Sequence, residues 1–247
     1  MKAPRRLRRA ETVLRKRSKR ILLVLERATN DFNHQAVLRT AEGFGLSQIW
    51  IVDDPLSQER NATKFNRGVS KGAHNWLEVR NFATPAECLE ALVAANRTIW
   101  ATDLSRDAEA VDSATLAPLP EKLALIMGRE SDGVSVEMLA AAERRLYLPM
   151  YGFAESFNLT VATALMLQRL FDACPQARGD LNHAELQTTR EQWYSKLATN
   201  QERLDEYHNW LDSPPPGDEE LRPEEELRRP RIPKKFWNRQ QLTKDAD

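Results

Sequence analysis

The sequence is poor in the features that mark secreted, membrane-spanning or metal-binding proteins. Its two cysteines, Cys88 and Cys174, lie far apart and lack metal-ligand spacing, which favours buried thiols over a disulfide or a metal site. No apolar run approaches the roughly 20 residues that span a bilayer. The basic N-terminus also lacks the continuous apolar segment of a secretory signal. We therefore expect a cytoplasmic protein with no metal and no membrane contact.

Net charge is also absent, because 36 Lys and Arg balance 36 Asp and Glu, but the charges are segregated. Residues 1–20 contain ten basic residues and one acid, Glu11, while residues 228–244 contain seven basic residues and no acid. Segregated charge creates a local positive surface whatever the total. The N-terminal cluster fits either a solvated basic helix or an RNA-binding helix. The second interpretation predicts RNA contacts by Arg5, Arg8, Arg9, Arg15 and Arg17, to which we add Arg169.

Alternating strand and helix patterns predict an α/β fold. Apolar segments typical of buried strands occur at 21–25, 49–52, 98–102, 123–127 and 145–148. Helical patterns occur at about 4–18, 34–44, 85–95, 136–143, 157–173 and 184–211. The alternation predicts a parallel sheet flanked by helices, and such sheets bind ligands at the carboxyl ends of their strands.

The same patterns divide the chain into three parts. Residues 1–20 are expected to form a basic helix, residues 21–175 an α/β domain, and residues 176–247 a helical and charged extension. Within the extension, the Pro- and Gly-rich segment 213–217 predicts a linker. The Glu-, Arg- and Pro-rich remainder is typical of a segment without a core of its own.

One string of chemically suggestive residues follows the last predicted strand. Residues 148–150 read Leu-Pro-Met, and a helix is expected to start within 155–158, near Ser156 and Asn158. Free N–H groups at a helix start attract oxygen acceptors, including carboxylates. Ser and Asn are also common helix caps, so this string alone favours a structural role.

A second string, residues 126–134, follows the strand at 123–127 and contains Gly128, Glu130 and Gly133. Glycine allows the backbone to approach a ligand closely. The string has no Walker lysine and no complete Gly-x-Gly-x-x-Gly pattern, so a phosphate cradle or a Rossmann site is poorly supported. An ordinary strand-to-helix loop is the alternative.

The third string, residues 33–41, combines Asn33 with Arg39 among apolar residues. The planar guanidinium of arginine offers several donors and suits phosphate. The alternative is that Asn33 caps the helix and that Arg39 is merely exposed.

Taken together, the order and spacing of these strings resemble the three motifs of the SpoU/TrmH branch of the SPOUT RNA methyltransferases. The likeness extends over about 21–171, and the strings 72–77 and 100–105 add to it. The resemblance implies a SPOUT fold with a deep trefoil knot at the C-terminal side, a homodimer, and transfer of a methyl group from S-adenosyl-L-methionine to a ribose 2′-hydroxyl. Residues 21–175 would then be the SPOUT methyltransferase domain.

The resemblance also implies roles for individual residues. Arg39 clamps a phosphate and stabilises the developing alkoxide, since a pKa above about 12 makes a neutral arginine base costly. Arg39 can serve the site of the partner subunit. The other catalytic positions are Asn33, Glu130, Ser156 and Asn158, and the cofactor-binding positions are Thr102, Leu104, Gly128, Leu148, Met150, Phe157 and Leu159.

Within the family, the basic helix before the first strand and the extension after the last helix resemble the tRNA branch, which methylates a D-loop guanosine ribose. Phe157, where leucine is commoner, and the acidic stretch 218–226 depart from the family pattern. Two alternatives remain open: a ribose methyltransferase acting on 23S rRNA, and a catalytically inactive RNA-binding SPOUT protein.

Overall fold

The computed structural model describes residues 3–26, 31–53, 72–129, 132–218 and 221. These residues contain one seven-stranded sheet in the order β3-β2-β1-β6-β4-β7-β5, in which every pair of neighbours is parallel. The strands are β1 (Ile21–Glu26), β2 (Gln48–Val52), β3 (Glu78–Phe82), β4 (Thr98–Thr102), β5 (Glu109–Ala110), β6 (Leu123–Met127) and β7 (Arg144–Tyr147). The predicted parallel α/β sheet is therefore confirmed.

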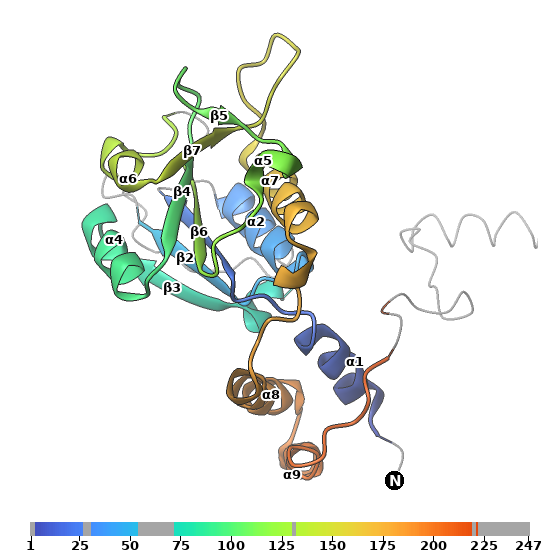
Figure 1. The fold of residues 1–247 in the computed structure, drawn as a ribbon. Helices are drawn as coiled ribbons and strands as arrows, with labels where there is room; N and C mark the ends of the chain where they lie inside the picture. The colour runs from blue at the N-terminus through green and yellow to red at the C-terminus, as the bar shows by residue number, and fades with distance from the viewer. Residues whose placement is uncertain (1–2, 27–30, 54–71, 130–131, 219–220, 222–247) are drawn as a thin grey trace, which may run out of the picture.

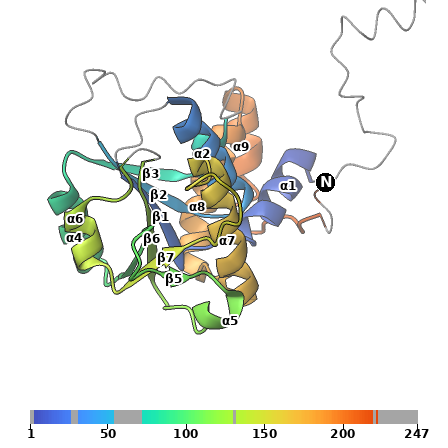
Figure 2. The ribbon, with the colours of Figure 1, turned by 90° about the horizontal axis from the view of Figure 1, so that it is seen from above.

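Helices cover both faces of this sheet (Figures 1 and 2). They are α1 (Arg5–Leu14), α2 (Asp31–Gly43), η1 (Ala73–Trp76), α4 (Pro85–Ala94), α5 (Ser113–Leu116), α6 (Val136–Ala141), α7 (Leu159–Ala173), η2 (Pro175–Ala177), α8 (His183–Leu197) and α9 (Gln201–His208). In both views α4 and α6 lie on one side of the sheet, and α2, α5 and α7 lie on the other.

The central strand β1 is buried along its whole length. Because successive strand side chains point to opposite faces, its residues contribute to two cores. Leu23 and Leu25 pack into the cluster that includes Leu38 of α2 and Leu167 of α7. Its other face joins the cluster formed with α4 and α6. This double burial explains why residues 21–25 of the strand form an uninterrupted apolar run.

The expected secondary structure is incomplete at β3, β5 and α5, and it is wrong over residues 184–211. The sequence did not indicate β3, whose five residues include two charged side chains and lie at the edge of the sheet. The helix expected over 184–211 is two helices, α8 and α9. It breaks at Asn200, whose side chain accepts a hydrogen bond from Arg203 N–H and caps α9.

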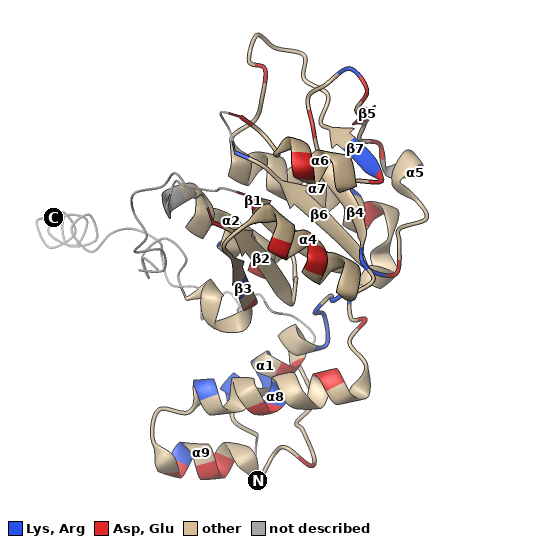
Figure 3. Cartoon of the chain, turned by 90° about the vertical axis from the view of Figure 1, so that its left-hand side faces the viewer, with Lys and Arg blue, Asp and Glu red and all other residues tan. Residues whose placement is uncertain are grey.

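A third cluster joins the two ends of the described chain. Leu7 and Leu14 of α1 pack with Trp193 and Tyr194 of α8 and with Tyr207 of α9. In Figure 1 these three helices lie together below the sheet. The basic helix and the predicted extension are thus in contact with each other. Figure 3 shows that basic positions continue from α1 into the segment that follows it.

Glu11 is the single acid of the N-terminal segment, and its side chain is fully buried against α8. Arg190 donates to both carboxylate oxygens, at 2.7 and 3.0 Å, and the Tyr194 hydroxyl donates to Oε1 at 2.9 Å. The bond to Glu11 raises the pKa of Arg190, and burial raises the pKa of Tyr194. Arg190 therefore keeps its charge, and the Tyr194 hydroxyl keeps the proton that it donates.

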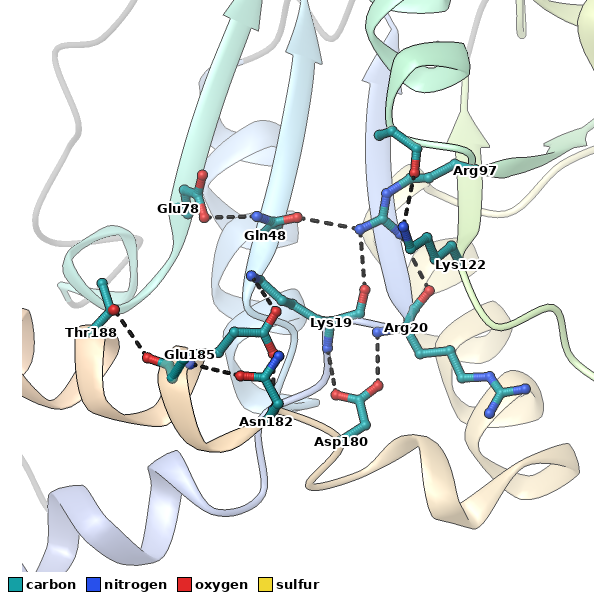
Figure 4. Close-up of polar contacts among 12 residues, drawn as sticks. Lys19, Arg20, Gln48, Glu78, Arg97, Lys122, Asp180, Asn182, Glu185 and Thr188 are labelled. Atoms are coloured by element: carbon teal, nitrogen blue, oxygen red, sulfur yellow. Dashed lines mark hydrogen bonds and ion pairs between the residues drawn. The ribbon is translucent and has the colours of Figure 1, made fainter.

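The helices α1, α8 and α9 form a helical unit, and polar contacts at the start of β1 connect this unit to the sheet (Figure 4). Asp180 accepts hydrogen bonds from the backbone N–H groups of Lys19 and Arg20, at 2.7 and 2.8 Å. The Lys19 ammonium donates to Glu185 of α8 at 2.9 Å. Arg97 donates to the carbonyls of Lys19 and Arg20, at 3.1 and 3.3 Å. Side-chain hydrogen bonds therefore connect the helical unit to the sheet, in addition to the covalent chain between them.

Candidate functional site

A cavity of about 480 Å³ lies where β4, β6 and β7 end and α7 begins. We call it the strand-end cavity. All seven residues predicted to bind the cofactor line it: Thr102, Leu104, Gly128, Leu148, Met150, Phe157 and Leu159. Ser156 lines it as well. The structure thus gathers residues from three separate stretches of the chain into one site, while their role in binding stays a prediction.

The parallel strands explain why these residues meet. Their carboxyl ends lie at one edge of the sheet, so the loops that follow them converge. The Thr102 hydroxyl donates to the Ile126 carbonyl at 3.3 Å, which joins the ends of β4 and β6. Asp103 N–H donates to the Leu146 carbonyl at 3.0 Å, which joins β4 to β7. Asp103, Arg129 and Asp132 add charged side chains to a mostly apolar lining, and the Asp103 carboxylate lies 3.8 Å from Arg145.

Gly128 is required by close backbone contact. The chain folds back beside it, and Arg129 and Gly133 exchange backbone hydrogen bonds of 3.1 and 3.0 Å. A Cβ on Gly128 would lie 2.1 Å from the Gly133 carbonyl carbon and 2.2 Å from the Val134 nitrogen. Gly133 itself has a φ of +68°, which favours glycine. The second string therefore shapes the cavity through its backbone.

The substitution Gly128→Ala is expected to weaken S-adenosylmethionine binding by at least about tenfold. The added methyl group displaces residues 133–134, and both of them line the cavity. Isothermal titration calorimetry measures the change. Gly43→Ala is the matched control, because a Cβ at Gly43 meets nothing within 4 Å. Equal affinity of Gly128→Ala and the control would contradict a cofactor role for this cavity.

Asn158 caps α7 and also connects two of the motifs. Its side-chain oxygen accepts from Thr160 N–H at 3.0 Å, and its amide nitrogen donates to the Asn33 side chain at 3.3 Å. Asn33 lies in the first turn of α2, just after the start of the helix at Asp31. Ser156 does not cap α7 and lies exposed in the preceding loop. The first and third strings therefore meet through a pair of amide side chains.

Arg39 lies elsewhere. It is exposed on α2 and lines a second cavity of about 420 Å³, which we call the α1–α2 cavity. Its lining comes from α1, α2, η1 and α8: Arg6, Arg9, Ala10, Val13, Arg39, Glu42, Ala73, Trp76, Trp193 and Leu197. Within one chain, Arg39 is not among the residues that line the strand-end cavity. Glu130, the remaining predicted catalytic residue, lies outside the described residues.

Most arginines predicted to bind RNA are accessible. Arg5, Arg9 and Arg15 on and after α1 and Arg169 on α7 are exposed. Arg8 is partly exposed and lies 3.4 Å from the Asp218 carboxylate. Such partly exposed pairs are weak, so a phosphate can compete for this arginine.

Arg17 requires a correction. Its side chain is only 1% exposed, and it donates to the Leu46 carbonyl and to Glu42, both at 2.7 Å. Burial lowers its pKa, while the charge of Glu42 opposes that shift. Its guanidinium also lies 5.0 Å from the Trp193 ring centroid. Arg17 therefore joins α2 to α8 and is not available to RNA in the described structure.

Sequence reasoning missed part of the strand-end cavity. Ala162 and Met166 of α7 line it beside Leu159. Their spacing of three and four residues places them on one helical face, and that signal was present in the sequence. Val136 and Leu139 also line it, but no motif marks them.

Three findings concern metal ions, membrane spans and cysteines. Among the described residues, no group of three or more His, Cys, Asp or Glu could hold a metal ion. No helix in the described ranges is long and apolar enough to cross a membrane. Cys88 and Cys174 are buried free thiols.

Comparison with known proteins decides the family, since residues 20–168 match the description SpoU rRNA Methylase family. This chain belongs to the SpoU methylase family. A tRNA (guanosine(18)-2′-O)-methyltransferase of Borreliella burgdorferi is 28% identical over 203 residues, which are 81% of this chain and 89% of that protein. Two solved structures of related enzymes superpose on this chain.

The TrmH/SpoU tRNA modifying enzyme of A. aeolicus superposes with a TM-score of 0.65 at 28% identity, over 78% of this chain and 96% of that one. An AdoMet-bound rRNA methyltransferase from Sinorhizobium meliloti superposes with a TM-score of 0.53 at 27% identity, over 66% of this chain and 60% of that one. The resemblance inferred from the three strings is therefore confirmed, as is the enzyme class of the family.

Proposed function

We propose that this SpoU-family enzyme transfers a methyl group from S-adenosyl-L-methionine to the ribose 2′-hydroxyl of the D-loop guanosine 18 of tRNA. The observation that carries the proposal is that all seven predicted cofactor residues line one cavity. The relative named for methylation of tRNA guanosine 18 matches over most of both chains, which supports the choice of substrate. The A. aeolicus structure, titled a tRNA modifying enzyme, supports it further.

The residues of the strand-end cavity fit the proposed cofactor. Leu104, Leu148 and Leu159 offer an apolar wall for the adenine, and Gly128 allows close backbone approach. Asp103 offers a carboxylate to hydroxyl or ammonium groups. The bound cofactor supplies an electrophilic methyl group on sulfur. Holding that methyl in line with the ribose oxygen accounts for much of the acceleration.

In the proposed reaction, the ribose oxygen forms a bond to the methyl carbon, the carbon–sulfur bond breaks, and the hydroxyl proton passes to solvent. Arg39 stabilises the developing alkoxide and clamps the adjacent phosphate. Asn33 and Asn158 hold the start of α7 through their mutual hydrogen bond of 3.3 Å. Ser156 and Glu130 complete the proposed catalytic set.

We propose further that the enzyme is a homodimer in which Arg39 serves the strand-end cavity of the partner subunit. The positions of Arg39 and of the strand-end cavity on different sets of elements support this arrangement. Exposed apolar side chains on α7 and the loop before it offer a surface for the contact: Tyr151, Phe153, Val161 and Leu165. The C-terminal trefoil knot is part of the same proposal, supported by the family likeness.

The proposed division of the chain assigns residues 1–20 to RNA binding, 21–175 to methyl transfer and 176–247 to a supporting extension. Because α1 packs against α8, the proposal places the RNA-binding surface on both helices and does not treat residues 1–20 as a separate arm. The enzyme is proposed to act in the cytoplasm, where tRNA is available.

The experiment that tests the proposed function is methyl transfer from labelled S-adenosylmethionine to separated tRNA and rRNA. We expect label in tRNA and little in rRNA. Label only in rRNA would replace tRNA by the ribosomal alternative. Absence of transfer together with absence of cofactor binding at millimolar concentration would favour an inactive RNA-binding protein.

A further inference from the structure

The α1–α2 cavity brings basic and aromatic side chains together away from the strand-end cavity. Arg6 and Arg9 of α1 and Arg39 of α2 line it, as do Trp76 and Trp193. Proteins that hold single-stranded nucleic acid combine these two side-chain types, because arginines bind phosphates and aromatic rings stack on bases. The string 72–77, which contains Trp76, has no role in the proposed chemistry so far.

The arginines of this cavity are available to a ligand. Arg9 and Arg39 are exposed, and neither forms an ion pair within the described ranges. The cavity also contains an acid, Glu42, but the buried Arg17 donates to Glu42 Oε1 at 2.7 Å and compensates its charge. The exposed arginines therefore leave a net positive potential in the cavity.

The aromatic wall is held in place before any ligand binds. Trp76 packs edge-on against Trp193, with ring centroids 5.4 Å apart at an angle of 71°. Trp193 is 5% exposed and supports the Arg17 guanidinium on its ring. An aromatic ring that is already fixed loses little conformational entropy on binding. Trp76 is thus suited to stack on a base.

We propose that the α1–α2 cavity holds an unpaired nucleotide of the RNA substrate, next to the nucleotide whose ribose is methylated. Its base stacks on Trp76, and its phosphate lies between Arg9 and Arg39. The two nucleotides are placed next to each other because Arg39 lines this cavity and is also the arginine proposed to act on the reacting ribose. The adjacency rests on the proposed function, whereas nucleotide binding rests on the cavity itself.

The test measures the dissociation constants of tRNA and of a short unstructured RNA by fluorescence anisotropy at several KCl concentrations. Trp76→Leu is expected to raise both constants about tenfold, the usual effect of losing one stacked base. Arg9→Gln is expected to reduce the slope of log K against log salt by about one. Trp76→Phe keeps a ring and should recover most of the affinity.

The matched control is Arg203→Gln, which changes an arginine on α9 whose side chain is 51% exposed and which lies outside the cavity lining. It should keep the wild-type constants and salt slope. Because Trp76 packs on Trp193, S-adenosylmethionine binding is measured in each variant to confirm folding. If Trp76→Leu does not fold, Arg9→Gln compared with its control Arg203→Gln still tests the inference.

Wild-type constants and salt slopes in folded Trp76→Leu and Arg9→Gln would overturn the inference, even if the enzyme methylates tRNA. If the wild type does not methylate tRNA but these variants weaken binding of the short RNA, the proposed function fails and the nucleotide site stands. Failure of the wild type to bind either RNA would overturn both.

Discussion

Arg39→Ala is expected to lower the turnover number for tRNA methylation by about 100- to 1000-fold, the usual cost of losing one donor to a developing oxyanion. S-adenosylmethionine affinity should stay near that of the wild type, because Arg39 is proposed to act on the ribose and its phosphate rather than on the cofactor, and it is not among the strand-end cavity residues of its own chain. Single-turnover methyl transfer and calorimetry measure the two quantities separately. This split is what distinguishes a group acting on the ribose from one that binds the cofactor.

Two further variants sharpen that result. Arg39→Lys keeps a positive charge but loses the planar fork, so it should recover part of the turnover. Arg203→Ala removes an exposed arginine of α9 and should behave as the wild type. Wild-type turnover in Arg39→Ala would remove Arg39 from the catalytic set.

Mixing two impaired proteins tests whether Arg39 serves the partner subunit, when S-adenosylmethionine is kept far below the dissociation constant of Gly128→Ala. An Arg39→Ala chain retains its strand-end cavity, and a Gly128→Ala chain retains its Arg39. If the site is shared, a mixed dimer contains one complete site, and the rate rises after unfolding and refolding the mixture. If each chain uses its own Arg39, no complete site forms and the mixture stays as slow as its parents.

Arg190→Met is expected to lower the free energy of unfolding by about 3–5 kcal/mol, because it removes the buried cation that donates to both oxygens of the Glu11 carboxylate. Arg15 lies 3.7 Å from the same carboxylate, but its side chain is 54% exposed and compensates the loss little. The Arg190 side chain is 8% exposed and that of Glu11 is 0% exposed, so water cannot replace the lost partner. The effect should appear in urea unfolding at a fixed protein concentration, since a dimer links stability to concentration.

The double variant Glu11→Leu with Arg190→Met is the control for this prediction. Removing both charges together should recover most of the lost stability. Arg203→Met, at an exposed pair with Glu206, should change stability little. A small effect of Arg190→Met alone would show that α1 and α8 do not depend on this pair.

The sequence predicted the sheet well where strands are buried on both faces. The run at 21–25 is apolar throughout because β1 is covered on both sides. It failed at β3, because an edge strand needs few buried side chains and keeps charged ones such as Glu78 and Arg80. The break between α8 and α9 was marked only by the capping residue Asn200.

The sequence predicted the residues of the strand-end cavity but not the position of Arg39 or the burial of Arg17. The family resemblance implied that positions such as Leu104, Gly128 and Leu148 bind the cofactor, and they meet in one cavity because the ends of parallel strands converge. The location of Arg39 in another cavity depends on how α1, α2, η1 and α8 are arranged in space, which the local sequence pattern does not contain. Arg17 resembled its basic neighbours, and only its contacts with Leu46 and Glu42 distinguish it.

The most direct test of the central claim is to locate the added methyl group on tRNA. A 2′-O-methyl group removes the nucleophile for alkaline cleavage, so the methylated position resists hydrolysis. The account predicts one newly protected site, at guanosine 18 of the D-loop, the position named for the B. burgdorferi relative. A methyl group on a base, or at a ribose outside the D-loop, would contradict it.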